Sequence, residues 1–375
     1  MVEIMATEPH DRLLFYVDPA WQKLPGPYSL LLYPFWGDQS SASSPFRKMA
    51  LESYPLDMMQ YGITADLDAA DAVLMPFSDE IAARYHPTLL AECQELSRTS
   101  GLHLVIDGMG HLETPFRLPN ASIIRYGGYR FETGPSEIHV TPFADDLLER
   151  YKGGTLTVRP KQDRPSISFV GWAHLTPSLR AKSIIKELPD RLHGFIDSRY
   201  RTKKKGLFFR ERALRALNAS PLVDAKTIAR PTYSGSIKTV VGDIETARRE
   251  FVDTMFDCDY GLEVRGNSNV STRLSEITGL GRIPVIIDTQ RNLPFGDELD
   301  YCDFSLVVDF RTLDKLPRIL HDFHANLSDA QFAQMQRNAR DAYVSHMRPD
   351  AVMSYVVRRI RQNMDRLGST RRIAR

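Results

Sequence analysis

The sequence predicts two α/β domains, each built on a mostly parallel β-sheet. A chain of 375 residues exceeds what one hydrophobic core usually serves. Short apolar runs alternate with helical segments in both halves, which is typical of strands joined by helical crossovers. Residues 1–150 hold 10 Lys and Arg against 21 Asp and Glu, and the remaining residues hold 38 against 26. This split indicates two units, of which the second holds any anionic ligand, although surface charge that drifted between domains gives the same count.

The first domain is predicted over residues 1–155. Five apolar runs are expected as strands: RLLFYV, SLLLYPF, DAVLMPF, LHLVIDG and SIIRYGG. The segments between them, such as SPFRKMALESYPLDMMQYG and HPTLLAECQELSRTSG, are expected as helices or loops. The run KGGTLTVRPKQDRP is rich in Gly, Pro and charge, and is expected to link the domains.

The second domain is predicted over residues 156–345. SISFVGW is expected as a strand, and TPSLRAKSIIKEL as a helix with Thr176 as N-cap and Pro177 in its first turn. The later elements are expected in this order: helices around KKKGLFFRERALRAL and TARREFVDTMFD, strand YGLEV, helix STRLSEITGLG, and strands IPVIID and FSLVVDF. Residues 346–375 are expected to form a basic helical tail, for which packing back on the first domain is one arrangement.

Composition excludes several classes of protein. No run of 18 or more apolar residues occurs, and MVEIMATEPHDRLL is not a signal sequence, so we expect a cytoplasmic protein. Three widely spaced cysteines, Cys93, Cys258 and Cys302, fit neither a disulfide framework nor a zinc site. The basic runs lack interleaved aromatic residues, which argues against nucleic acid. Lys203 to Lys205 and seven arginines after position 357 form either a solvated face or a peripheral contact with anionic lipid at the inner membrane surface.

The stretch EVRGNSNVSTRLSEITG indicates a nucleotide site. A strand is expected to end near Val264, and a loop then leads to a helix capped by Ser271 or a neighbour. Free N–H groups in the first turn of a helix bind anions, and Arg273 adds a fork that suits phosphate oxygens. Glu276 lies one turn deeper on the same face, where a carboxylate can accept hydrogen bonds from a ribose diol. The alternative is a surface ion pair between Arg273 and Glu276.

Four motifs in this region occur in a characteristic order: GNSNVSTRLSE, GRIPVIID, NLPFGDELDY and FSLVV. Together they resemble the nucleotide-binding domain of the exostosin-type inverting glycosyltransferases. Weaker similarities occur at YVDPAW, DLDAADAVLMPF and RPSISFVGWAHLTPSLR. The resemblance implies the GT-B fold, in which two Rossmann-like domains face one another across a cleft and the C-terminal domain binds the donor.

The resemblance also implies an activity: transfer of a sugar from a nucleoside diphosphate sugar to a glycan or lipid-linked glycan acceptor, with inversion, in the synthesis of a capsule or O-antigen. It places Arg273 at the donor phosphates, Glu276 at the ribose and Ser271 at the helix cap. Four further donor-binding residues are implied: Gly171, Arg180, Arg265 and Asn267. Arg282 and Val264 replace the Cys and Pro of the family pattern, so we expect an altered base pocket.

An inverting transfer requires a base, which is expected from the first domain. Candidates near strand ends are Asp18, Asp38, Asp107, His111 and Glu113. The two aspartates Asp18 and Asp107 also suit helix or turn caps, and a lone histidine is often structural.

Two D-x-D triplets, at Asp66 to Asp68 and at Asp257 to Asp259, are similar to a known metal motif. Because Arg273 and helix N-termini can neutralise a leaving diphosphate, we expect neither metal nor cofactor.

Two other functions remain open from the sequence. One is a non-catalytic carbohydrate-binding or scaffold subunit that kept the fold and lost the base. The other is an enzyme such as a sugar epimerase that uses a different nucleotide, although no G-x-G-x-x-G follows the first strand. Glycan transfer by the purified chain separates these functions.

Overall fold

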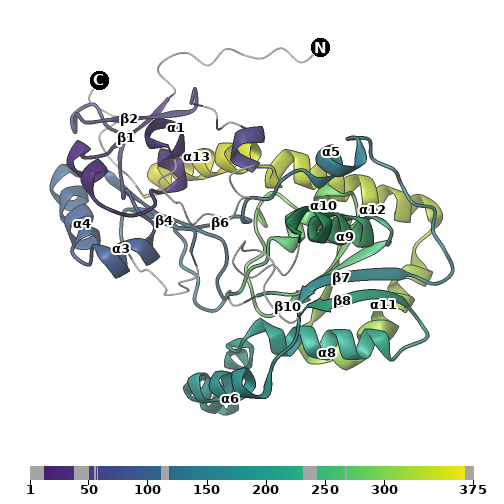
Figure 1. Ribbon diagram of the computed structural model, residues 1–375. Coiled ribbons are helices and arrows are strands. Elements are labelled where there is room, and N and C mark those ends of the chain that lie inside the picture. Colours follow the sequence, from purple (N-terminus) through teal and green to yellow (C-terminus); the bar gives the residue numbers. More distant parts are fainter. Residues whose placement is uncertain are drawn as a thin grey trace.

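The computed structural model describes residues 12–37, 50–54, 56, 58–110, 118–230, 243–266 and 268–367. Figure 1 shows two layered α/β domains, the first in purple and blue and the second in teal and green. The yellow C-terminal helices extend from the second domain to the first. His111, Glu113, Asp38 and Asn267 lie outside the described residues. None of the described helices combines the length and apolar character needed to span a bilayer.

The first sheet has six strands in the order β2-β1-β3-β4-β5-β6, and its neighbouring strands pair in parallel. The strands are β1 Leu13–Tyr16, β2 Tyr61–Thr64, β3 Ala72–Leu74, β4 His103–Gly108, β5 Ala121–Arg125 and β6 Glu137–His139. The chain reverses direction across the sheet between β1 and β3. Ligands of such sheets bind at the carboxyl ends of the strands beside this switch point.

The second sheet has five parallel strands in the order β11-β10-β9-β7-β8. The strands are β7 Ser166–Trp172, β8 Asp224–Arg230, β9 Tyr260–Glu263, β10 Ile283–Asp288 and β11 Leu306–Asp309. Its switch point lies between β7 and β9. The two sheets confirm the predicted fold class of two Rossmann-like parallel-sheet domains.

Helices cover both sheets. Around the first sheet these are η2 Pro19–Lys23, η3 Leu30–Leu32, α1 Tyr33–Trp36, α3 Asp79–Tyr85, α4 Leu89–Ser100 and α13 Pro349–Arg366. Around the second they are α5 Leu147–Lys152, α6 Pro177–Lys186, α7 Leu188–Ile196, η4 Ser198–Thr202, α8 Gly206–Asn218, α9 Ile244–Phe256, α10 Arg273–Gly279, η5 Tyr301–Asp303, η6 Phe310–Lys315, α11 Leu316–Asn326, α12 Asp329–Ala342 and η7 Tyr343–Met347.

The expected strand over SLLLYPF is wrong, because this run forms η3 and α1. Ser29 Oγ accepts a hydrogen bond from Leu31 N, and Asp107 Oδ2 accepts one from Leu30 N. Pro34 occupies the first turn of α1, where its missing N–H costs nothing. A short apolar run between turns has no period that separates a buried strand from a buried helix. The helix beginning at Pro177 is confirmed, since Thr176 Oγ1 accepts from Leu179 N at 3.3 Å.

The core of the second domain lies on both faces of its sheet. Ile167 and Phe169 of β7 pack with α8 and α11 on one face, whereas Val170 packs with α9 and α10 on the other. Alternate side chains of a strand point to opposite faces, so a doubly covered strand is apolar throughout. In the first domain, α13 packs against β5, and Asn363 Nδ2 donates to Ser122 Oγ at 2.9 Å.

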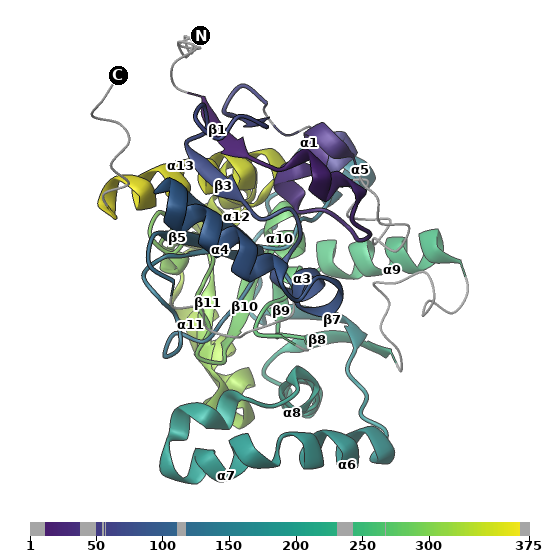
Figure 2. The ribbon, with the colours of Figure 1, turned by 90° about the vertical axis from the view of Figure 1, so that its left-hand side faces the viewer.

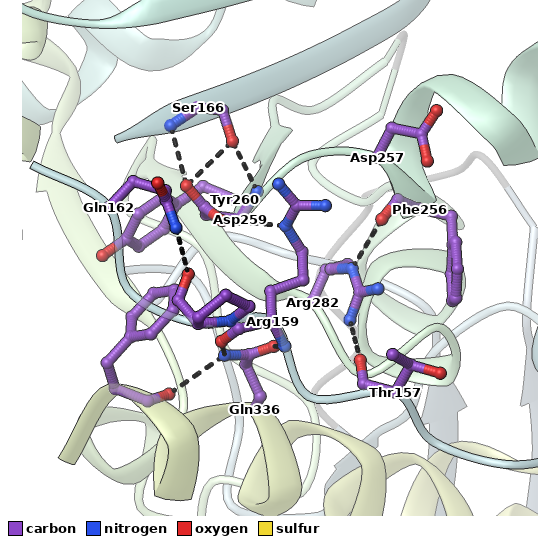
Figure 3. A network of polar contacts seen from close by, with 12 residues as sticks. Thr157, Arg159, Gln162, Ser166, Phe256, Asp257, Asp259, Tyr260, Arg282 and Gln336 are labelled. Carbon is purple, nitrogen blue, oxygen red and sulfur yellow. Dashed lines mark hydrogen bonds and ion pairs between the residues drawn. The ribbon is translucent and has the colours of Figure 1, made fainter. Parts of the chain in front are cut away.

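The amino edge of the second sheet is held by the network in Figure 3. Asp259 accepts hydrogen bonds from Ser166 N at 3.0 Å and from Arg159 Nε at 2.9 Å. Arg282 is buried and donates to Phe256 O at 3.0 Å and to Thr157 O at 3.2 Å. The expectation that Arg282 alters the base pocket is therefore wrong. Arg282 directly precedes β10, which places it at the edge opposite the strand ends where ligands bind.

Candidate functional site

The switch point of the second sheet brings together residues that are about a hundred positions apart. Gly171 lies near the end of β7, and α10 follows the loop after β9. Gly171 has φ +153°, and a Cβ there would lie 3.0 Å from Arg273 Nη2. Glycine therefore permits both the backbone conformation and the close approach of the guanidinium.

The Arg273 guanidinium is held in a fixed orientation. Its Nη2 donates to Val170 O at 2.6 Å, and its Cζ lies 4.4 Å from the ring centre of Phe169. The Nη1 atom is buried and has no hydrogen-bond partner among the described residues. Burial lowers the pKa of Arg273, and Arg248 and Arg230 act in the same direction, whereas Glu276 and Glu263 oppose the shift. A buried guanidinium N–H without a protein partner can donate to a bound anion.

At the start of α10, the side-chain acceptor comes from the residue before the N-cap. Thr272 is the N-cap residue and makes no side-chain capping bond, whereas Ser271 Oγ accepts from Arg273 N at 3.3 Å. Leu274 packs into the core of the first domain. The residue after Arg273 thus anchors the helix to the other half of the molecule.

Glu276 pairs with Arg248 of α9, whose Nη1 donates to Glu276 Oε1 at 2.9 Å. Both side chains are about one-tenth exposed, at 11 % each. The alternative of a surface ion pair between Arg273 and Glu276 is wrong, because the turn of α10 directs Glu276 toward α9. Arg248 is not among the residues predicted from the sequence, because its distance along the chain from Glu276 gives no indication that the two side chains meet. We refer to Gly171, Arg248, Arg273 and Glu276 as the Arg273 site.

Two other predicted donor residues make different contacts. Arg180 of α6 pairs with Glu211 of α8, and its Cζ lies 5.5 Å from the ring centre of Phe208. Arg265 is buried, and its Nη1 donates to Tyr129 Oη at 2.6 Å. Arg265 therefore joins the second domain to the loop between β5 and β6 of the first.

That loop, residues 126–133, forms much of the junction between the domains. Asn269 Nδ2 donates to Gly128 O at 3.2 Å, and Arg130 forms an ion pair with Asp288 at 2.7 Å. Glu263, at the end of β9, forms a buried ion pair with Arg291, with side chains 0 % and 3 % exposed. The Glu263 carboxylate raises the pKa of Arg291 despite its burial. Sequence reasoning missed this pair, because only the fold brings its members together.

The predicted bases that the structure describes act as caps. Asp18 Oδ1 accepts from Ala20 N at 2.8 Å at the start of η2. Asp107 is buried, with Oδ1 accepting from Met109 N at 2.8 Å and Oδ2 from Leu30 N at 3.1 Å. Both carboxylates thus accept hydrogen bonds from backbone N–H groups.

A different carboxylate, Asp79, begins α3 a few residues beyond β3, and it lies beside Arg125 at the carboxyl end of β5. It is buried, and neither of its oxygens has a hydrogen-bond partner among the described residues. Arg125 Nη1 lies 3.6 Å from Asp79 Oδ2, and Arg125 Nε lies 3.6 Å from Glu137 Oε1. Burial raises the pKa of Asp79 to about 6, although Arg125 opposes the shift. We refer to Asp79, Arg125 and Glu137 as the Asp79 cluster.

Sequence reasoning missed Asp79, although one signal was available. Asp79 follows an apolar run after one serine, much as Asp18 and Asp107 follow theirs directly. A carboxylate at the first position of a helix is usually a favourable dipole partner, which hides its burial from the sequence.

The D-x-D triplets have structural roles. Asp66 Oδ1 accepts from Asp68 N at 3.0 Å, and Asp259 belongs to the network at the amino edge described above. Among the residues that the structure describes, no group of three or more His, Cys, Asp or Glu side chains is placed to hold a metal ion.

The basic runs are not freely solvated where the structure describes them. Lys203 forms an ion pair with Glu132 at 2.5 Å, and Lys204 lies over the Phe209 ring at 4.8 Å. Burial lowers the pKa of Lys204. In the tail, Arg358 pairs with Glu298 at 2.7 Å and Arg359 with Asp297 at 2.6 Å. The described members of both runs thus make contacts within the protein, and Arg371, Arg372 and Arg375 lie outside the described residues.

No protein-family model and no curated protein matches the sequence. Among solved structures, TarM is 9 % identical, with a TM-score of 0.33 over 71 % of this chain and 50 % of its own. A glycosyltransferase from Rickettsia africae is 8 % identical, with a TM-score of 0.36 over 81 % and 78 %. Anabaena HepE in complex with UDP is 13 % identical, with a TM-score of 0.37 over 96 % and 100 %. The chain spans about half the length of TarM. The likeness is too loose to assign a function, which therefore depends on the geometry described above.

Proposed function

We propose that this protein is a glycosyltransferase that moves a sugar from a nucleoside diphosphate sugar to a glycan acceptor. The observation that supports this most directly is the Arg273 guanidinium at the switch point of the second sheet. It is oriented by Val170 O and Phe169, and its buried Nη1 has no partner among the described residues. A fixed, desolvated cation at this position suits the diphosphate of a bound nucleotide.

The position of Glu276 favours a nucleotide over free phosphate as the ligand. Arg248 holds one of its oxygens on the neighbouring helix, one turn beyond Arg273. A carboxylate one turn from a phosphate-binding arginine is placed to accept hydrogen bonds from a ribose diol. Arg248 also adds positive charge beside Arg273, so the leaving diphosphate is stabilised by protein cations and no metal is required.

The Asp79 cluster supplies the candidate base. Direct inversion requires a carboxylate that takes the acceptor proton on the side away from the leaving nucleotide. Asp79 lies in the opposite domain, at the carboxyl edge of its parallel sheet, where Arg125 of β5 lies 3.6 Å away. A pKa near 6 leaves this carboxyl ionised at neutral pH and basic enough to accept a proton.

The finer assignment follows the motifs around Arg273. We propose an exostosin-like enzyme that acts with inversion in polysaccharide synthesis, with a glycan or lipid-linked glycan acceptor. In this proposal Arg273 binds the donor phosphates and Glu276 the ribose, as the resemblance implies, and the approach of Arg273 to Gly171 supports it.

The direct test measures binding and transfer separately. Thermal unfolding of the purified chain with a panel of nucleoside diphosphate sugars identifies the donor, since a ligand that binds the folded state raises Tm. Release of nucleoside diphosphate and labelling of a glycan panel with that donor then test transfer. Stabilisation without turnover would favour the non-catalytic subunit, and stabilisation by no nucleotide sugar would contradict the proposed function.

A further inference from the structure

The helices α6 and α7, with η4, form a projection from the second domain that we call the α6–α7 arm, residues 177–202. Figures 1 and 2 show α6 at the periphery of the domain, and Figure 2 shows α7 beside it, beyond α8. Of the described residues in α6, none is buried, and in α7 only Gly194 is. The arm therefore adds little to the core of the domain.

The arm nevertheless displays a stripe of large apolar side chains. The stripe consists of Ile184, Ile185, Leu188, Leu192, Phe195 and Ile196. Ile185, Phe195 and Ile196 are 72 %, 79 % and 90 % exposed. Outside the arm, the structure exposes large apolar side chains only as scattered residues such as Met59 and Tyr85 among the described positions. A contiguous exposed group of this kind indicates a binding surface, whereas scattered residues do not.

The apolar residues of α7 are spaced so that they share one face of the helix, and that face is exposed. Leu188, Leu192, Phe195 and Ile196 follow the i, i+4, i+7, i+8 pattern of one helical face. The other face contacts protein: Arg191 lies over the Phe208 ring at 5.1 Å, and a Cβ on Gly194 would lie 3.1 Å from Arg201 Cγ. The helix thus packs through its polar side and exposes its apolar side.

Positive charge accompanies the stripe. Residues 177–202 contain six Lys and Arg against three Asp and Glu. Lys182, Lys186, Arg199 and Arg201 are exposed, and of these Arg199 is paired with Asp197. Lys182 lies three positions before Ile185 and hence on the same side of α6. A short amphipathic helix with aliphatic and Phe side chains beside Lys and Arg is typical of segments that lie in the headgroup region of anionic membranes.

We propose that the α6–α7 arm docks this protein on an anionic membrane surface, with Phe195, Ile196 and Ile185 inserted among the acyl chains. The arm replaces the lysine run and the tail as the membrane contact, because the arginines and lysines described there are engaged within the protein. The stripe lies on a projecting pair of helices, which suits insertion into a lipid layer. The arm's contact with Glu211 and Phe208 of α8 fixes its orientation on the domain.

The test is co-sedimentation of the full chain with phosphatidylcholine vesicles, with and without phosphatidylglycerol. We expect the wild type to bind the anionic vesicles, and the double variant Phe195→Ser, Ile196→Ser to lose about tenfold or more in partition coefficient. The double charge variant Lys182→Glu, Lys186→Glu should weaken binding to anionic vesicles in a salt-dependent manner. Met59→Ser, which removes an apolar side chain 70 % exposed in the first domain, is the matched control and should bind as the wild type does.

Failure of the wild type to bind, or equal binding by the double variant, would overturn the proposal. The main alternative is self-association through the stripe, which sedimentation velocity tests. If the wild type is a dimer and the variant Phe195→Ser, Ile196→Ser is a monomer, the stripe is a dimer interface instead. Because both side chains are exposed, an unchanged Tm of the variant confirms that it is folded. The vesicle assay requires no sugar donor, so its outcome is independent of the proposed function.

Discussion

The carboxyl edges of the two sheets share one topology but differ in charge. In the first domain, a buried Asp79 lies beside Arg125, which also approaches Glu137. In the second, Arg248 and Arg230 lie near Arg273, together with the carboxylates Glu276 and Glu263. The same parallel sheet order places ligand-facing residues at equivalent edges, and the side chains then decide the chemistry. In the proposed function the edge with three arginines receives the leaving nucleotide, and Asp79 of the other edge receives the acceptor proton.

The largest expected effect is that of Asp79→Asn. An amide cannot accept the acceptor hydroxyl's proton, so we expect kcat to fall by about 10²- to 10⁴-fold. The measurement is steady-state transfer with donor affinity determined in parallel, which should change little. Glu95→Gln, in an exposed pair with Arg98, is the matched control. Wild-type turnover by Asp79→Asn would remove Asp79 from the mechanism.

The same carboxyl predicts a pH dependence. Its pKa is raised from 3.8 to about 6 in the folded protein, so the folded state retains a proton that the unfolded chain has lost between these values. Asp79 should therefore reduce stability as pH rises from about 3.8 to 6, and kcat/KM should rise with pH to a plateau above about 6. Asp79→Asn should flatten both profiles in this range. If kcat/KM of Asp79→Asn still falls at low pH, the fall is due to another titrating group.

The next effect is that of Arg273→Ala at the edge with three arginines. Loss of a preorganised cation at a leaving diphosphate typically costs about 2–4 kcal/mol, or roughly two to three decades in rate. The comparison is with Arg311→Ala, an arginine in an exposed pair with Asp309. Turnover within about threefold of wild type, in a folded Arg273→Ala protein, is incompatible with a phosphate role.

Glu276→Gln should have a smaller effect, confined to nucleotide binding. The amide oxygen accepts neutral hydrogen bonds where the carboxylate accepts charge-assisted ones, so nucleoside diphosphate affinity should fall by about 1–3 kcal/mol. Calorimetric titration measures this loss, and the 2′-deoxy nucleotide serves as control, because its affinity should respond less to the substitution. If variant and wild type bind the ribonucleotide equally, Glu276 does not contact the ribose, and its pairing with Arg248 is structural.

The smallest expected effect is that of metal removal. Because Arg273 and Arg248 supply the positive charge at the leaving diphosphate, EDTA should leave the transfer rate unchanged. Rate measurements before and after chelation, with manganese added back, provide the check. If EDTA removes activity and manganese restores it, the protein cations alone do not neutralise the leaving diphosphate.

The sequence by itself determined the two-domain α/β class, the Thr176 cap and the place of Arg273 and Glu276 on one helix after a strand. These follow from local rules: apolar runs with turn residues mark strands, and loops after parallel strands share an edge. The nearness of Gly171 to this site was implied instead by the family resemblance. SLLLYPF marks the limit of such rules, because burial of a short run does not reveal its backbone conformation.

Only the tertiary structure decided which charges meet. The fold directs Glu276 to Arg248 rather than to Arg273 and pairs Glu263 with Arg291 across a buried junction. Among the described residues it gives Asp107 two backbone donors, whereas the Asp79 oxygens have no hydrogen-bond partner there. It also turns the apolar side of α7 outward, although the same periodicity in a sequence predicts a buried face. The physical reason is that spacing determines which side chains share a face, whereas the desolvation and pairing of that face depend on the elements packed against it.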